Sequence, residues 1–159
     1  MMTMSDGSTV DADYVGVAST PDADGGVGTL IVSHSSVTAT TIEVGRNGLI
    51  GGDEGTINGN LVVRGTLAPG ESPGRMIING GVLLENEGKI ILDVASDGHG
   101  GFLTDEVVLT LGSSFAFGSS KVVFNFLGDT DPNAFGASGR FDSRPISTQP
   151  IVAATAVAI

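Results

Sequence analysis

The residues best suited to hold a metal ion stand in a loop that begins at Asp129. Hard cations such as Ca²⁺ prefer several oxygen ligands, and Asp129, Asp131 and Asn133 supply side-chain oxygens at alternate positions. The loop departs from an EF-hand, because Ala134 replaces the turn glycine and Arg140 replaces the bidentate glutamate. The three residues are therefore a candidate calcium site, and the alternative interpretation is a turn with solvated carboxylates.

A serine-hydrolase pattern occurs at Gly70-Glu71-Ser72-Pro73-Gly74, and Asp93 or Asp97 and then His99 follow in hydrolase order. A nucleophile elbow needs a strand before the serine and a helix after it, with a backbone amide next to the nucleophile. Pro73 removes that amide, and strand-type residues follow instead of a helix. The pattern therefore predicts no hydrolase.

Two pairs of carboxylates, Glu85/Glu87 and Asp105/Glu106, have the residue types that glycosidases use. Pairing in sequence does not establish the separation of the carboxyl groups that the reaction requires. The chain also has no Trp and one Tyr to form an aromatic platform for sugars. A polysaccharide-active enzyme is therefore an alternative to a non-catalytic protein, and a calcium-dependent binding module is a second alternative.

Composition and charge exclude several classes of partner. The 159 residues contain 7 Lys and Arg against 18 Asp and Glu, a net charge of −11 that repels a phosphate backbone. No apolar run reaches the roughly 20 residues that cross a bilayer. The chain has no Cys, and neither of its 2 His residues has a second ligand at zinc spacing. We expect no nucleic-acid partner, no membrane insertion by this segment and no cofactor apart from the calcium candidate.

The chain is punctuated by 25 Gly and 6 Pro, which separate short runs of Val, Ile and Leu. Hydrophobic residues make up 40% of the chain but aromatic residues only 5%, a composition that favours an aliphatic core between pleated sheets. No stretch shows a sustained helical period. The sequence thus predicts an all-β fold.

A spacing near 20 residues organises these runs. Gly45 and Gly65 lie 20 residues apart, and the pairs Asn58-Gly59 and Asn79-Gly80 lie 21 apart, a plausible length for one turn of a β-solenoid. An antiparallel β-sandwich would tolerate the same composition and is the alternative fold. We expect a polar N-terminal cap at residues 1–27, solenoid repeats at 28–127, and an irregular C-terminal segment at 128–159 whose apolar tail suggests truncation.

The central apolar residues of each run are expected to form the core. They are Leu30, Val32, Ile42, Val44, Ile57, Leu61, Val63, Leu67, Ile77, Leu83, Ile91, Val108 and Phe124.

The segment from Gly55 to Gly74 resembles the passenger-associated transport repeat of bacterial autotransporters. The resemblance is carried by Gly65-Thr66-Leu67-Ala68-Pro69-Gly70-Glu71-Ser72-Pro73-Gly74 and by the later pair Thr104-Asp105. The runs from Val15 to Gly45 resemble the repeat shared by autotransporter passengers and PEP-CTERM surface proteins. The resemblance implies a right-handed parallel β-helix with irregular caps, and repeats that serve as scaffold without catalytic residues.

We therefore expect a secreted or cell-surface scaffold of a Gram-negative bacterium, extracellular or on the outer membrane, that serves adhesion, matrix formation or display. The first residues lack the basic start and apolar run of a signal peptide, so the export signal and anchor are expected outside this chain. Expected partners are a second copy stacked end to end, neighbouring domains of a longer chain, or a surface glycan or protein ligand.

Overall fold

The computed structural model describes residues 1–70, 73–85, 87–110 and 112–137, and nearly all of its regular elements are short β-strands. Gly-rich and Pro-containing turns separate these strands, as the punctuation of the sequence predicts. The described part of the chain has one helix, the short α1 (Pro132–Ala137). The predicted all-β class is confirmed.

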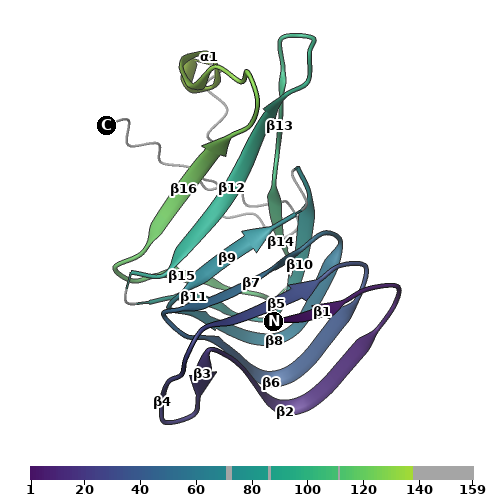
Figure 1. Ribbon diagram of the computed structural model, residues 1–159, viewed down its shortest axis with the longest axis vertical. Helices are drawn as coiled ribbons and strands as arrows, with labels where there is room; N and C mark the ends of the chain where they lie inside the picture. The colour runs from purple at the N-terminus through teal and green to yellow at the C-terminus, as the bar shows by residue number, and fades with distance from the viewer. Residues whose placement is uncertain (71–72, 86, 111, 138–159) are drawn as a thin grey trace.

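The first of two large sheets holds strands that are widely separated along the chain (Figure 1). Its members are β1 (Met2–Met4), β5 (Gly28–Val32), β7 (Gly48–Gly52), β9 (Thr66–Pro69), β12 (Lys89–Ser96), β13 (Phe102–Thr104) and β16 (Lys121–Phe126). Every pairing in it is parallel except β12 with β13, which form an antiparallel hairpin.

The second large sheet contains only parallel pairings. Its members are β2 (Thr9–Val17), β6 (Ser36–Val44), β8 (Gly55–Val63), β10 (Arg75–Asn79), β11 (Val82–Leu84), β14 (Glu106–Leu109) and β15 (Phe115–Phe117). A separate hairpin of β3 (Ser19–Thr20) and β4 (Ala23–Asp24) lies between β2 and β5 in the chain. Because every pairing in the two large sheets except β12 with β13 is parallel, the alternative of an antiparallel sandwich is wrong.

Strands in the middle of the chain stack with the spacing expected from the sequence. Asn79 lies in register with Asn58, and its Nδ2 donates to Asn58 Oδ1 at 2.6 Å across 21 residues. Asn58 Nδ2 in turn donates to Thr38 Oγ1 at 3.1 Å across 20 residues. Thr38, Asn58 and Asn79 thus form a polar ladder along the outside of the second sheet.

The long strands of the second sheet change register near their middles. The pairing of β6 with β8 shifts between Thr38 and Thr41, which marks a β-bulge. Opposite the bulge, Gly59 has a φ of 138°, and a Cβ at that position would overlap the carbonyl oxygen of Ala39. Only glycine allows the two backbones to approach this closely.

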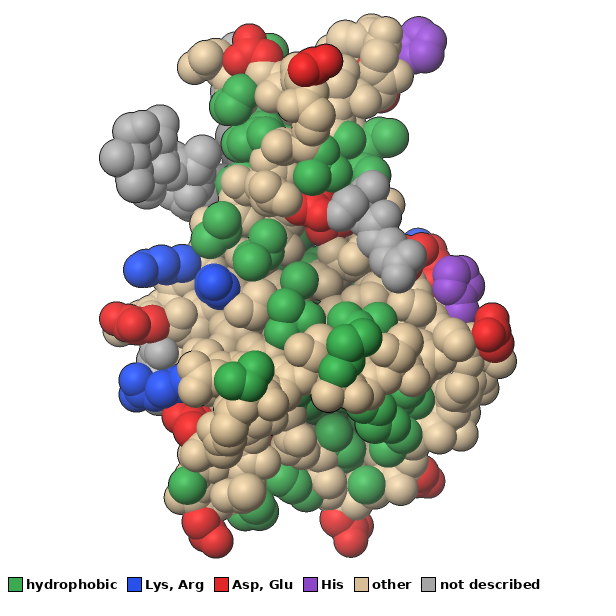
Figure 2. Space-filling view, viewed as in Figure 1, with side chains coloured by type: hydrophobic (Ala, Val, Ile, Leu, Met, Phe, Trp, Pro, Cys, Tyr) green, Lys and Arg blue, Asp and Glu red, His purple; other side chains and the backbone are tan. Residues whose placement is uncertain are grey.

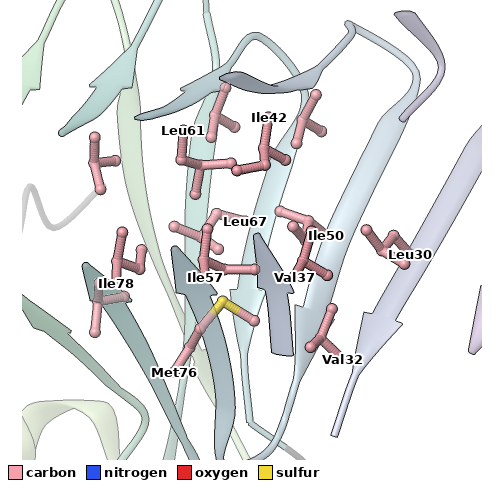
Figure 3. Close-up of a cluster of buried hydrophobic side chains, with 14 of the residues drawn as sticks. Leu30, Val32, Val37, Ile42, Ile50, Ile57, Leu61, Leu67, Met76 and Ile78 are labelled. Atoms are coloured by element: carbon pink, nitrogen blue, oxygen red, sulfur yellow. The ribbon is translucent and has the colours of Figure 1, made fainter. Parts of the chain in front are cut away.

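Aliphatic side chains from both sheets meet in a continuous core, part of which is shown in Figure 3. Of the predicted core residues, eight are buried: Leu30, Val32, Ile42, Val44, Ile57, Leu61, Val63 and Leu67. The other five are only partly buried or exposed: Ile77, Leu83, Ile91, Val108 and Phe124. Phe124 packs against the core from its edge, whereas the first four point outward and their neighbours are buried instead. The sequence-based assignment was therefore wrong by one residue in β10, β11, β12 and β14.

Residues at both ends of the described part of the chain also form strands of the two large sheets or lie next to them. β1 and β2, inside the expected cap at 1–27, pair with β5 and β6 and are the outermost strands at that end of the two sheets. β12, β13, β16 and α1 project beyond the stacked strands at the other end (Figure 1). Of the expected irregular segment at 128–159, residues 138–159 lie outside the described residues.

Candidate functional site

A buried carboxylate, Asp105, ties three segments together where β13 leads into β14. The side chain is 3% exposed. Gly74 N–H donates to its Oδ1 at 2.7 Å and Asp93 N–H donates to its Oδ2 at 2.9 Å. Its own N–H donates to the Asp93 carbonyl at 3.0 Å. Asp105 therefore connects the turn before β10 with the middle of β12.

The surroundings of Asp105 leave no room for another side chain at the turn. Gly70 has a φ of 93°, and a Cβ there would lie 2.5 Å from Asp105 Oδ1. Burial raises the pKa of the Asp105 carboxyl above its ordinary value, and hydrogen bonds from the amides of Asp93 and Gly74 oppose this rise. Both carboxylate oxygens accept backbone hydrogen bonds, so Asp105 is placed to stabilise the structure and not to contact a ligand.

Next to this carboxylate lies a cleft of about 950 Å³, which we call the acidic cleft. One wall comes from the β12–β13 hairpin, and the other comes from the loop after β7 and the start of β10. The lining residues are Asp53, Glu54, Pro73, Gly74, Arg75, Asp97, Gly100, Gly101, Phe102, Leu103, Thr104, Glu106 and Phe135. Acidic side chains are visible where the projecting hairpin meets the stacked strands (Figure 2).

Arg75 is the one basic side chain among the described residues that line the acidic cleft. Arg75 forms an ion pair with Glu54, with 3.0 Å between Nη2 and Oε2, and the hydrogen bond to Glu54 raises the pKa of the guanidinium. The backbone N–H of Arg75 donates to Asp53 Oδ1 at 3.1 Å. Asp53, Glu54 and Glu106 together leave an excess of negative charge around Arg75.

The hairpin wall combines a capped turn with apolar side chains. Asp97 Oδ1 accepts the N–H groups of His99 and Gly101, both at 2.8 Å, which fixes the turn of the hairpin. Phe102 packs edge-on against Phe135, with 5.3 Å between the ring centroids. The adjacent Leu103 is 53% exposed.

The calcium candidates lie at the start of α1 and are not among the residues that line the acidic cleft. Asp129, Asp131 and Asn133 are exposed, and Asp131 Oδ1 accepts the N–H of Asn133 at 2.9 Å. Since Pro132 is the first helical residue, Asp131 occupies the N-cap position of the helix. Within the described residues no group of three His, Cys, Asp or Glu side chains is arranged to hold a metal ion. Calcium binding here stays a prediction.

The hydrolase pattern is not assembled among the described residues. Ser72 lies outside them. Asp93 Oδ1 accepts a hydrogen bond from Asn125 Nδ2 at 2.7 Å, and the ring Nδ1 of His99 lies 2.9 Å from the carbonyl oxygen of Asp97 in the hairpin turn. These interactions give Asp93 and His99 structural partners.

The carboxylate pairs considered for polysaccharide chemistry are divided between different environments. Asp105 is buried, whereas the adjacent Glu106 lines the acidic cleft. Glu85 Oε2 lies 3.9 Å from Arg64 Nη1, and Glu87 is exposed.

Arg64 is the centre of an ion-pair network that the sequence did not suggest. Its Nε lies 3.1 Å from Asp24 Oδ1, and its Nη2 contacts Glu43, which also accepts a hydrogen bond from the Tyr14 hydroxyl at 3.0 Å. The network attaches the β3–β4 hairpin to the outside of the second sheet. The near-20-residue spacing of Glu43, Arg64 and Glu85 is the signal that would have placed them on neighbouring strands.

No protein-family model, curated protein or solved structure matches the chain. Among the described residues, no helix has the length and apolar character needed to span a membrane.

Proposed function

We propose that the chain is a non-catalytic β-helical scaffold in which the two large sheets are faces of one right-handed parallel β-helix. The observation that carries the proposal is the alternation of strands along the chain. β5, β7 and β9 enter the first sheet, and β6, β8 and β10 follow them in the second, all with parallel neighbours. Parallel strands joined by crossovers are right-handed in nearly all proteins.

The polar side chains that connect neighbouring segments of this arrangement support a structural role. Asp105 uses both side-chain oxygens on backbone amides, Arg64 holds an inserted hairpin, and the ladder through Asn58 joins neighbouring strands. Each group strengthens the stack and has a partner within it. Such use of polar side chains is what a scaffold requires.

The resemblance of Gly65–Gly74 to autotransporter passenger repeats supports a location outside the cell. In this proposal the chain is secreted or lies on the surface of a Gram-negative bacterium, where it serves adhesion, matrix formation or display. The β3–β4 and β12–β13 hairpins are the segments available for display. Its partners would be another copy at an open end, adjacent domains, or a surface glycan or protein.

Insertion of a ten-residue Gly/Ser epitope tests the scaffold role. We expect insertions after Asp22 in the β3–β4 turn and after Gly98 in the β12–β13 turn to lower the melting temperature by less than about 4 °C, the shift for about 1 kcal/mol in a chain of this size. Loop length has only a weak entropic cost. The control insertion after Leu61, within β8, should unfold the protein because it interrupts paired strands.

Three results would each contradict part of the proposal. Unfolding by both hairpin insertions would show that these segments are part of the stable core. Release of reducing ends from acidic polysaccharides by the purified chain would identify an enzyme. Antibodies against the chain should label intact producing cells or their medium, and signal only after cell lysis would overturn the proposed location.

A further inference from the structure

One edge of β13 faces the acidic cleft without a strand partner in the described part of the chain. Asp105 N–H donates to the Asp93 carbonyl, and Asp97 N–H donates to the Gly101 carbonyl. Hydrogen-bonded pairs alternate along an antiparallel ladder, so Leu103, which lies opposite Ala95, also directs its N–H and carbonyl toward β12. The backbone groups of the two flanking residues therefore point the other way, into the cleft.

This free edge consists of the N–H and carbonyl groups of Phe102 and Thr104. An open strand edge is a template for adding another extended chain. The adjacent hairpin turn and the Asp105 contacts hold the edge in place, so a strand that binds there does not have to order it first.

The charge around the edge selects the kind of peptide. Asp53, Glu54, Asp97 and Glu106 line the acidic cleft, and Arg75 is already paired with Glu54. A cationic segment would be attracted and an anionic one repelled, and the net charge of −11 acts in the same direction.

The cleft also offers an apolar contact and enough space. Leu103 is 53% exposed, and its side chain lies on the opposite face of β13 from Phe102 and Thr104. A volume of about 950 Å³ lies at the upper end of the range of ligand sites, roughly 300–1,000 Å³. Alternating basic and apolar side chains on an added strand would meet the carboxylates and Leu103 respectively.

We propose that the acidic cleft binds an extended cationic peptide segment of another protein, which adds a strand to the free edge of β13. This assigns a peptide-binding site to the chain and does not depend on its role as a scaffold. The peptide-binding proposal can be wrong while the scaffold proposal is right, and the reverse also holds.

The probe is the peptide acetyl-Lys-Val-Lys-Val-Lys-amide carrying an uncharged fluorescent dye, titrated with the full chain at low ionic strength and followed by anisotropy. We expect saturable binding. The same peptide with Glu in place of Lys should not bind. A version with alternate backbone amides N-methylated keeps its charge but loses the strand hydrogen bonds, and we expect at least tenfold weaker binding.

Variants of the chain distinguish the contribution of the free strand edge to peptide binding from the contribution of the negative charge. Thr104→Pro removes an N–H that faces the cleft, and proline is tolerated on strand edges, so binding should weaken about tenfold with the hairpin retained. Glu54→Gln with Glu106→Gln should weaken binding at least as much. The matched control is Asp11→Asn with Asp13→Asn on β2, which changes the net charge equally and should leave binding unchanged.

Equal affinity for the N-methylated and unmodified peptides would overturn the proposal, since it would show attraction by charge alone. Equal weakening by the β2 control variant would overturn it too. Displacement of the peptide by calcium would identify a metal site instead, provided that sodium chloride at the same ionic strength does not displace it. If Thr104→Pro does not fold, as judged by circular dichroism, the N-methylated peptide and the double Gln variant decide the question.

Discussion

At the residue scale, Asp105 shows how a single carboxylate can organise a corner of this protein. Its two oxygens accept the amides of Gly74, just before β10 of the second sheet, and of Asp93, in β12 of the first sheet. The Glu106 amide, next in the chain, donates to the Gly74 carbonyl at 2.9 Å. Gly74 is therefore held by the side chain of Asp105 and by the backbone of Glu106, the first residue of β14.

Asp105→Asn should destabilise the chain by about 1–3 kcal/mol at pH 7, because one backbone N–H would then face the amide NH₂ group. Since burial raises the pKa of Asp105, the folded state binds a proton more readily than the unfolded state. The stability advantage of wild type over the variant should therefore grow as pH falls from 7, and level off below about 3.9, the ordinary pKa of Asp. Urea unfolding of both proteins between pH 3 and 7 measures this difference.

The comparison is controlled by Asp13→Asn, which replaces an exposed carboxylate on β2 and should change the stability by less than about 0.5 kcal/mol. An advantage of wild type that shrinks as the pH falls would contradict the expected sign. It would mean that the two backbone hydrogen bonds outweigh burial in setting the pKa of Asp105.

At the element scale, the direction of side chains could be predicted from the sequence only where polar residues alternate with apolar ones. In β6 the run Thr41-Ile42-Glu43-Val44 identifies its buried face, and Ile42 and Val44 are indeed buried. In β10 the run Met76-Ile77-Ile78 has no such alternation. Because side chains on a strand have a period of two, an error of one residue exchanges the two faces.

Polar residues at the ends of these uniformly apolar runs indicate which face of the strand is exposed. Arg75 and Asn79 are the first and last residues of β10 and are both exposed, so Ile77, at even spacing from each, must share their face. Lys89 and Asp93 place Ile91 outside in the same way. A rule that used polar flanking residues would have corrected these strands.

The packing of β10 can be checked with two neighbouring residues of the same type. Ile78 is fully buried, so Ile78→Ala should cost about 2–5 kcal/mol through lost burial and the cavity left behind. Ile77 lies on the outer face, and Ile77→Ala should cost about 1 kcal/mol or less. Chemical denaturation of the two variants gives both values, and equal costs would contradict the register described for β10.

The acidic cleft could not be predicted at this scale. Its lining comes from residues 53–54, 73–75, 97, 100–104, 106 and 135. These segments meet because β13 continues the sheet beyond the end of β9. No spacing rule relates an inserted hairpin to a loop more than 40 residues earlier. The family resemblance includes the pair Thr104-Asp105, but it does not predict the hydrogen bonds that Asp105 accepts from Gly74 and Asp93.

At the scale of the whole molecule, each strand pairs only with its neighbours in the stack, so the two ends differ from the middle. β6 lies between β2 and β8, whereas β2 has a partner on one side only within the described residues. Proteins built from such nearest-neighbour contacts open most easily at their ends. Asp11 and Asp13 on β2 add like charges that oppose pairing with another edge.

Hydrogen exchange measured at two protein concentrations tests how this end behaves. At low concentration the amides of β2 should exchange faster than those of β6, because half of them point away from β6 into solvent. End-to-end association would cover these amides, and salt would assist it by screening the charge of Asp11 and Asp13. We therefore expect slower exchange in β2, with β6 unchanged, at high concentration in about 0.5 M salt. If β2 exchange is independent of concentration while sedimentation shows a monomer, copies of the chain do not stack through this edge, and its acidic residues are sufficient to keep the open edge unpaired.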